Sequence, residues 1–240
     1  MTVLFWDIDG TLLTTAKAGV FAWEDAVREL TGRTEFELAR LRIAGLTDYQ
    51  IAVKTFESLG IDVDEEFLHR FVNRYGELLP SSLPRRKGRV LPNVREILEH
   101  LQQHHPDVRS YLLTGNTRAG ATAKLRHYDL IHFFPDGAFA EDTGDRSSIA
   151  ARALELARRA GPIADGGAFV VGDTPHDIDC ANAIRARTIA VATGGYSLEE
   201  LEAHRPWRVL AELPAPREFM KLLHDGRAEQ SSVLTARSSS

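Results

Sequence analysis

The chain has 240 residues, of which 43% are hydrophobic and 26% are charged, so it can bury a sizeable core as one large domain or as a domain with a smaller insert. Its 29 basic and 34 acidic residues give a net charge of −5 without a basic excess, which argues against nucleic acid as the main partner. The single cysteine, Cys180, excludes an intramolecular disulfide and a multi-cysteine metal site.

Membrane and secretory segments are not indicated by the sequence. No apolar run approaches the ~20 residues that a bilayer-spanning helix needs. The N-terminus begins with a short apolar strand instead of a charged-then-apolar signal. We therefore expect a cytoplasmic protein without a membrane partner, whose oligomeric state the sequence leaves open.

The first predicted element is an apolar strand within residues 3–11, which ends in the segment Asp7-Ile-Asp9-Gly10-Thr11. Side chains alternate faces along a strand, so Asp7 and Asp9 leave its end on the same side. Two carboxylates this close repel each other unless a cation or a shared proton compensates. The pair therefore indicates a divalent metal, acid/base chemistry or both, with a simple turn as the alternative interpretation.

Residues 15–79 have the apolar spacing of helices. One helix is predicted over residues 17–30, and apolar residues recur at helical spacing within 52–59 and 68–79. Because no strand alternation interrupts them, the region is predicted to be an all-helical insert. Pro and Gly punctuate residues 80–92, which are expected to return the chain to the main domain.

From residue 94 onward, predicted helices and strands alternate. This alternation is typical of βαβ units and a parallel sheet. The predicted helices cover residues 94–101, 117–127, 149–157 and 175–185, and the predicted strands cover 108–113, 168–172 and 188–192.

Two of these strands also end in polar groups. The strand at 108–113 is followed by Thr114-Gly115-Asn116, where a hydroxyl and open backbone N–H groups suit a phosphate oxygen. The strand at 168–172 is followed by Asp173, and the next helix starts so as to bring Asp177 close to it. In an open parallel sheet, the crevice outside the carboxyl ends of the strands is where ligands bind.

The motifs, in this order, resemble three of the four signature motifs of the haloacid dehalogenase superfamily: Asp7-Ile-Asp9-Gly10-Thr11, Thr114-Gly115-Asn116 and Gly172-Asp173-Thr174-Pro175-His176-Asp177. The resemblance implies an α/β fold with a Rossmann-like parallel-sheet core and a helical cap inserted just after the first strand. We expect the core to comprise residues 1–14 and 90–226 and the cap to comprise 15–89. Residues 227–240 are Ser-rich without periodic apolar positions, which predicts a disordered tail.

The resemblance also implies roles for these residues. Asp7 matches the nucleophile that forms an aspartyl-phosphate, and Asp9 matches the acid/base that protonates the leaving group and later activates water. Mg²⁺ would be bound by Asp7, the backbone carbonyl of Asp9 and Asp173, with Asp177 holding a ligand or its water. The phosphate-binding groups would be Thr114, Gly115 and Asn116.

The activity implied is Mg²⁺-dependent hydrolysis of a small phosphorylated metabolite, either a phosphoglycolate-like or a sugar phosphate monoester, similar to that of phosphoglycolate phosphatase. A dehalogenase is disfavoured because haloacid dehalogenases lack the second acid, here Asp9. A phosphomutase of the β-phosphoglucomutase type keeps both acids and is an alternative. A non-hydrolytic phospho-accepting signalling or binding module, such as a response-regulator receiver, also uses an acidic Mg²⁺ pocket, but receivers lack a helical insert after the first strand.

The chain departs from the family pattern at the third motif, which is usually a Lys ahead of the helix that leads into the fourth. Arg146 is the positional match, and its guanidinium is a competent partner for phosphate. Lys124, on the helix that follows Thr114, is the other candidate. For either residue, a solvated charge on a helix is the alternative.

Within the predicted cap, the segment containing Gly45 resembles the substrate-facing loop of phosphoglycolate phosphatase-like members. Gly45 would permit close approach of substrate, while Arg42, Thr47 and Asp48 would contact the leaving group. The alternative is a turn between helices in which Thr47 or Asp48 caps the helix that follows.

Overall fold

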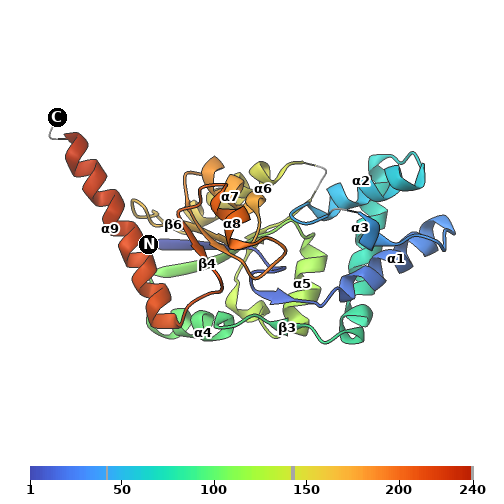
Figure 1. The fold of residues 1–240 in the computed structure, drawn as a ribbon, viewed down its shortest axis with the longest axis horizontal. Helices are drawn as coiled ribbons and strands as arrows, with labels where there is room; N and C mark the ends of the chain where they lie inside the picture. The colour runs from blue at the N-terminus through green and yellow to red at the C-terminus, as the bar shows by residue number, and fades with distance from the viewer. Residues whose placement is uncertain (42, 142–143, 239–240) are drawn as a thin grey trace.

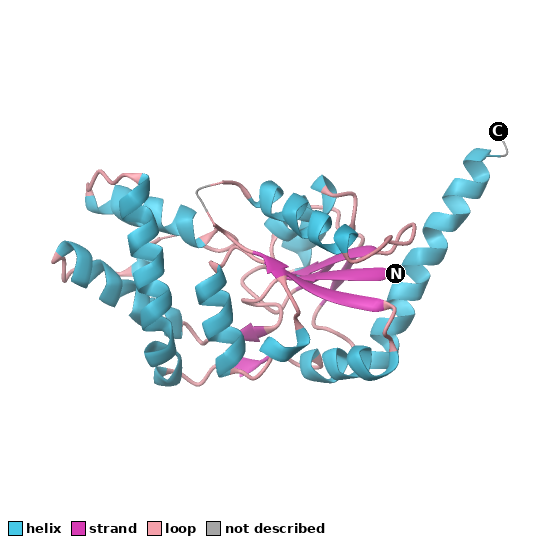
Figure 2. Ribbon diagram, turned by 180° about the vertical axis from the view of Figure 1, so that it is seen from behind, coloured by secondary structure: helices cyan, strands magenta, loops and turns pink. Residues whose placement is uncertain are grey.

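The computed structural model describes residues 1–41, 43–141 and 144–238. Its centre is a sheet of six parallel strands in the order β5-β4-β1-β6-β7-β8, with helices on both faces (Figure 2). The predicted fold class, an α/β protein with a Rossmann-like parallel sheet, is therefore confirmed. The strands are β1 (Thr2–Trp6), β4 (Val108–Leu113), β5 (Gly137–Ala138), β6 (Ala168–Gly172), β7 (Arg187–Val191) and β8 (Arg208–Leu210).

The central strand β1 is buried on both faces, and its alternating side chains define two layers of core. Val3 and Phe5 pack on the side of α6 (Arg146–Arg159) and α7 (Pro175–Ala183). Leu4 and Trp6 pack on the side of α4 (Val94–His104), α5 (Arg118–His127) and α9 (Pro216–Ser238). This continuous apolar strand is what a parallel sheet covered on both faces requires. A further core helix is α8 (Leu198–Glu202).

A separate helical cap lies beside the carboxyl ends of the strands (Figure 1). It contains α1 (Ala18–Thr31), α2 (Asp48–Leu59) and α3 (Glu65–Ser82) around an aromatic centre, in which the Trp23 and Phe71 rings lie 4.9 Å apart. The helix α3 also packs against α5 of the core. The antiparallel pair of β2 (Leu13–Thr14) and β3 (Arg89–Val90) carries the chain into the cap and back.

The end of the chain differs from the sequence-based expectation. Residues 227–240 are predicted to be a disordered tail, whereas the structure places residues 227–238 in the continuation of α9. The segment contains neither Gly nor Pro after Gly226, so nothing in it terminates a helix that has already begun. Buried Phe219 and Leu223 anchor the start of that helix to the sheet.

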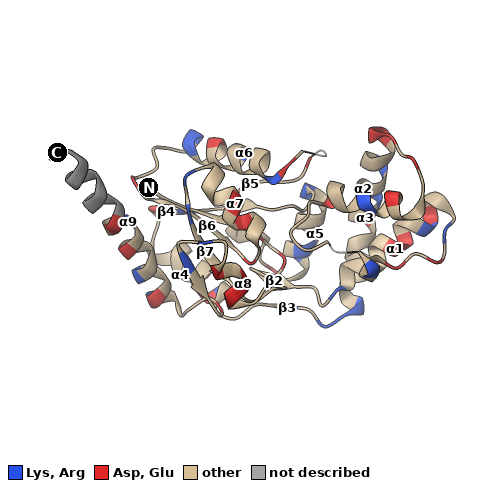
Figure 3. Ribbon diagram, turned by 45° about the horizontal axis from the view of Figure 1, so that its top comes forward, with Lys and Arg blue, Asp and Glu red and all other residues tan. Residues whose placement is uncertain are grey.

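The surface carries charges of both signs. In the view of Figure 3, basic and acidic residues are interspersed along the cap helices and the core. Among the described residues, no helix is long and apolar enough to cross a membrane.

Candidate active site

The order of the strands brings the predicted motifs together. β1 lies between β4 and β6, and Trp6 is in register with Leu112 on one side and Val171 on the other. The residues that follow these strands, Asp7, Thr114 and Asp173, therefore meet at one edge of the sheet.

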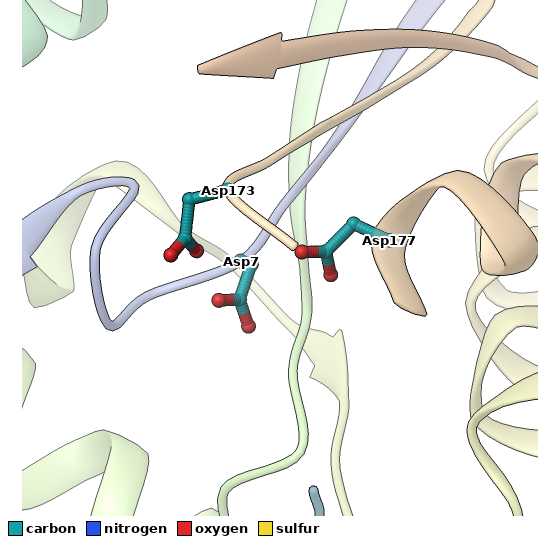
Figure 4. A group of neighbouring side chains, drawn as sticks. All are labelled: Asp7, Asp173 and Asp177. Carbon is teal, nitrogen blue, oxygen red and sulfur yellow. The ribbon is translucent and has the colours of Figure 1, made fainter. Parts of the chain in front are cut away.

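Three buried carboxylates converge at this edge. Oxygen atoms of Asp7, Asp173 and Asp177 lie within 4.8 Å of one another, and their carboxylates approach from two strand ends and one helix (Figure 4). Burial, then the charge of Asp177, raises the pKa of Asp7 to about 7. Burial and the charge of Asp7 likewise raise the pKa of Asp173. Oxygen donors whose charges oppose one another fit a hard divalent cation such as Mg²⁺.

The loop after Asp9 is built to approach Asp173 closely. Gly10 has a φ of 85°, and a Cβ placed on it would lie 2.3 Å from Oδ2 of Asp173. The Thr11 hydroxyl donates to Oδ1 of Asp173 at 3.2 Å. Gly194 covers the same carboxylate from the loop after β7. No role is predicted for Gly194 from the sequence, because it lies three residues after the end of β7 in a segment without an acid or a recognised motif.

Arg146 stands at the first position of α6, between the nucleophile candidate and the cap. Its Nη2 donates to Oδ1 of Asp177 at 2.5 Å and lies 3.7 Å from Oδ1 of Asp7. Its Nη1 donates to the Gly45 carbonyl at 3.3 Å. Its buried Nε has no hydrogen-bond partner in the described part of the chain. The carboxylates of Asp177 and Asp7 raise the pKa of the guanidinium despite its burial, so it stays charged.

Both carboxylate oxygens of Asp177 accept hydrogen bonds. Oδ1 accepts from Arg146, while Oδ2 accepts from the Thr174 backbone N–H at 3.0 Å and from the Thr174 hydroxyl at 2.8 Å. In this arrangement Asp177 fixes the start of α7 and the side chain of Arg146. Asp7 and Asp173 are left as the carboxylates best placed to bind a cation directly.

Asp9 differs from the other acids because its side chain is 42% exposed. Its Oδ2 accepts from Nζ of Lys124 at 2.5 Å and from Nδ2 of Asn116 at 2.9 Å. Lys124 is buried and also donates to Oδ1 of Asn116 at 2.5 Å. The structure therefore places Arg146 beside Asp7 and Lys124 beside Asp9.

The segment after β4 links these groups to one another. The Thr114 hydroxyl lowers the pKa of Asp7 through a hydrogen bond and accepts from Nδ2 of Asn116 at 2.8 Å. Gly115 lets the cap pass closely, because a Cβ there would lie 3.2 Å from Cα of Thr47 and 3.0 Å from Nη1 of Arg146. The sequence predicts a role for the backbone N–H of Asn116, whereas the structure shows that its side chain makes the hydrogen bonds to Asp9 and Lys124.

The cap residues have more structural contacts than the sequence suggested. Thr47 is buried and caps α2 in a reciprocal capping box with Gln50, which agrees with the alternative interpretation of this segment. Asp48 joins the cap to the core, because its N–H donates to the Gly115 carbonyl at 2.8 Å and its Oδ2 accepts from the Thr117 N–H at 2.7 Å. Arg42 lies outside the described residues.

A cavity of about 500 Å³ lies between the core and the cap. Its core side includes Asp7, Asp9, Arg146 and Asp173, and Gly45 lines its cap side. A larger cavity of about 920 Å³ between α3 and α5 includes none of these groups. The smaller cavity is therefore the one in which chemistry can take place.

The cap–core contact at Asp48 makes a prediction about stability. Burial raises the pKa of Asp48 to about 6, with Lys124 and the Thr117 N–H opposing the shift. Because its pKa is raised in the folded state, protonated Asp48 contributes fully to the free energy of unfolding below pH ~4. This contribution is lost as the pH rises through ~6, and the loss is at most about 3 kcal/mol. Asp48→Asn keeps the acceptor and removes the titration.

Urea unfolding at pH 4 and at pH 7 measures this effect. The stability of Asp48→Asn relative to the unchanged protein should rise by about 1–3 kcal/mol between the two pH values. A difference that is the same at both would show that Asp48 does not titrate in the folded protein.

Comparison with known proteins agrees with this geometry. The model of the haloacid dehalogenase-like hydrolase family matches residues 4–182. The chain belongs to this family. The match covers the strands that carry Asp7, Thr114 and Asp173, together with the cap between the first two. Among curated proteins, none matches the sequence significantly.

Solved structures share the fold of this family member at low sequence identity. A hydrolase from Pseudomonas syringae is 21% identical with a TM-score of 0.66, covering 94% of this chain and 99% of the other. A predicted phosphoglycolate phosphatase from Haemophilus somnus is 17% identical with a TM-score of 0.66, covering 88% and 94%. A predicted β-phosphoglucomutase from Thermotoga maritima is 20% identical with a TM-score of 0.60, covering 94% and 99%.

Proposed function

We propose that this hydrolase is a Mg²⁺-dependent phosphatase of small phosphate monoesters that works through a phosphorylated Asp7. The observation that carries the proposal is the environment of Asp7. A buried, charged Arg146 lies 3.7 Å away, and a second acid, Asp9, is accessible in the same cavity. The description of one structural neighbour as a predicted phosphoglycolate phosphatase is consistent with it.

In the first half-reaction, Asp7 attacks the phosphorus and the bond to the ester oxygen breaks. Phosphoryl transfer needs the charge on the transferring oxygens to be offset. Arg146 is positioned for this by Asp177, and its buried Nε is a donor without a partner among the described residues. The Thr114 hydroxyl, which hydrogen-bonds to Asp7, and the backbone N–H groups after β4 would provide further donors.

Asp9 provides the proton for the departing alkoxide and then accepts a proton from the water that hydrolyses the phosphorylated Asp7. Both of its hydrogen bonds, from Lys124 and Asn116, involve Oδ2. These hydrogen bonds leave Oδ1 unused, and in this proposal Oδ1 carries the proton. In this proposal Lys124 orients the acid/base and Arg146 neutralises the phosphoryl group.

Asp7, Asp173 and the backbone carbonyl of Asp9 would hold the Mg²⁺ ion. Asp177 would lie next to the ion while it binds the side chain of Arg146. The bound ion would offset the negative charge that the phosphate and the carboxylates bring together. Because the pKa of Asp7 is raised to about 7 without a cation, cation binding should weaken as the pH falls below that value.

Release of inorganic phosphate from a panel of phosphorylated metabolites, with Mg²⁺ and with chelator, tests the proposed function. We expect release that is lost in chelator and restored by added Mg²⁺. Full activity in chelator would contradict the metal assignment. Isomerised sugar phosphate without free phosphate would assign a phosphomutase, and a stable phosphorylated Asp7 without turnover would assign a non-hydrolytic module.

A further inference from the structure

The cap side of the catalytic cavity is largely apolar. The side chains that line it there are Val20, Trp23, Leu38, Ile43, Leu46 and Ile51. Val20, Ile43 and Ile51 are only partly buried, so they present apolar surface to the cavity. Apolar surface inside a concave site is what a ligand covers when it binds.

Charged groups on this side of the cavity are few. Among the described residues, the cap contributes Lys17 and Asp48 to the lining. Asp48 already accepts from the Thr117 N–H, and Lys17 is exposed at the start of α1. A polyhydroxylated leaving group would therefore leave most of its hydroxyls unpaired against apolar walls, which is unfavourable.

Tyr75 brings one hydroxyl to the cap side of the cavity. The residue lines the cavity and is 5% exposed. Burial raises the pKa of this phenol, so the hydroxyl keeps its proton at neutral pH. A neutral phenol can donate one hydrogen bond to a ligand and accept another.

We propose that the alcohol part of the preferred substrate is an apolar aliphatic or aromatic group with at most one polar atom, which faces Tyr75. This inference rests on the proposed phosphatase function and names the substrate class for the same site. The phosphate binds between Asp7 and Arg146 on the core side. The apolar body lies against Val20, Ile43 and Ile51 on the cap side.

Linear alkyl phosphates of increasing length test the proposal, because their leaving groups differ little in acidity. If the cap wall binds the chain, kcat/KM should rise about fourfold for each added methylene from ethyl to hexyl phosphate. Hexyl phosphate should then exceed glucose 6-phosphate and 2-phosphoglycolate by at least about tenfold.

Two matched variants on α2 test whether the dependence of kcat/KM on chain length comes from the apolar wall of the cavity. Ile51 and Val53 are both partly buried on α2, but only Ile51 lines the cavity. Ile51→Asn should lower the hexyl-to-ethyl ratio of kcat/KM at least about tenfold, whereas Val53→Asn should leave it unchanged. Should thermal melting show that Ile51→Asn is unfolded, Val20→Ala applies the same test from α1.

The outcomes separate this inference from the function on which it rests. A flat alkyl series, or faster turnover of glucose 6-phosphate or 2-phosphoglycolate than of hexyl phosphate, overturns the apolar substrate class and leaves the phosphatase proposal standing. An equal loss of the ratio in Val53→Asn also overturns it. Absence of phosphate release from every ester tested overturns both.

Discussion

Replacing Asp7 by asparagine is expected to lower kcat by at least about 10⁴-fold on every phosphate ester that the protein hydrolyses. An amide is a poor nucleophile, and it is also a weaker ligand for a divalent cation. The substitution preserves shape at a buried site, so the fold should be retained. Steady-state phosphate release with Mg²⁺, together with circular dichroism to check folding, measures the effect.

An exposed acid on the cap provides the control for this experiment. Asp62 lies in the loop between α2 and α3, away from the catalytic cavity, and Asp62→Asn should behave like the unchanged protein. Residual activity of Asp7→Asn above about one part in a hundred would show that Asp7 is not the nucleophile.

Replacing Arg146 by alanine is expected to lower kcat and kcat/KM together by about 10³-fold or more. In the proposed role the guanidinium would offset charge that is largest in the transition state, so its loss should appear in kcat and not only in KM. Because Asp177 and Asp7 would lose their buried partner, Arg146→Lys is the companion variant. It keeps the charge and should restore part of the activity.

A Lys124 variant tests whether the two buried cations near the site, Arg146 and Lys124, have different roles. Lys124→Met removes the donor to Asp9 and not to Asp7, so its effect should depend on the leaving group. The loss should be large for alkyl phosphates and small for nitrophenyl phosphate, whose leaving group needs no proton. If Arg146→Ala shows that leaving-group dependence and Lys124→Met does not, the two roles are reversed.

The polar residues at the strand ends could be predicted to meet because their positions after parallel strands bring them together. Asp7, Thr114 and Asp173 each follow a run of apolar residues, and parallel strands bring such positions to one edge. The helical insert was predicted from the spacing of apolar residues, because residues 15–79 show helical periodicity and no strand alternation.

The choice between Arg146 and Lys124 could not be made from the sequence. Both residues lie close to predicted motifs, and only the packing of α5 and α6 on the sheet shows which acid each one contacts. Asp48 was predicted as a residue that contacts the leaving group, but its role in joining the cap to the core was not predicted, for the same reason. Its contacts with Gly115 and Thr117 form between segments that are distant in sequence, and no local pattern reports them.

Short elements were missed for a different reason. β5 and β8 contain two and three residues, too few for an alternating pattern to appear. α9 extends through residues whose Ser-rich composition resembles that of a tail, and its start is stabilised by contacts with the sheet. Composition alone cannot register such contacts.

The central claim is that Asp7 is phosphorylated and that Asp9 carries the proton, and one experiment separates the two roles. In Asp9→Asn, the nucleophile is intact, but the proton donor and the base for water are missing. Nitrophenyl phosphate should still phosphorylate Asp7 in the first step, because nitrophenolate leaves without a proton. The second step should then be slow.

Rapid mixing of Asp9→Asn with nitrophenyl phosphate and Mg²⁺, followed by peptide mass spectrometry, is the direct test. The account predicts a burst of nitrophenol that approaches one equivalent per site, with a phosphate mass increase on the peptide that contains Asp7. The absence of a burst, with equal losses on nitrophenyl and alkyl phosphates and no modified peptide, would contradict both the covalent intermediate and the acid/base role of Asp9.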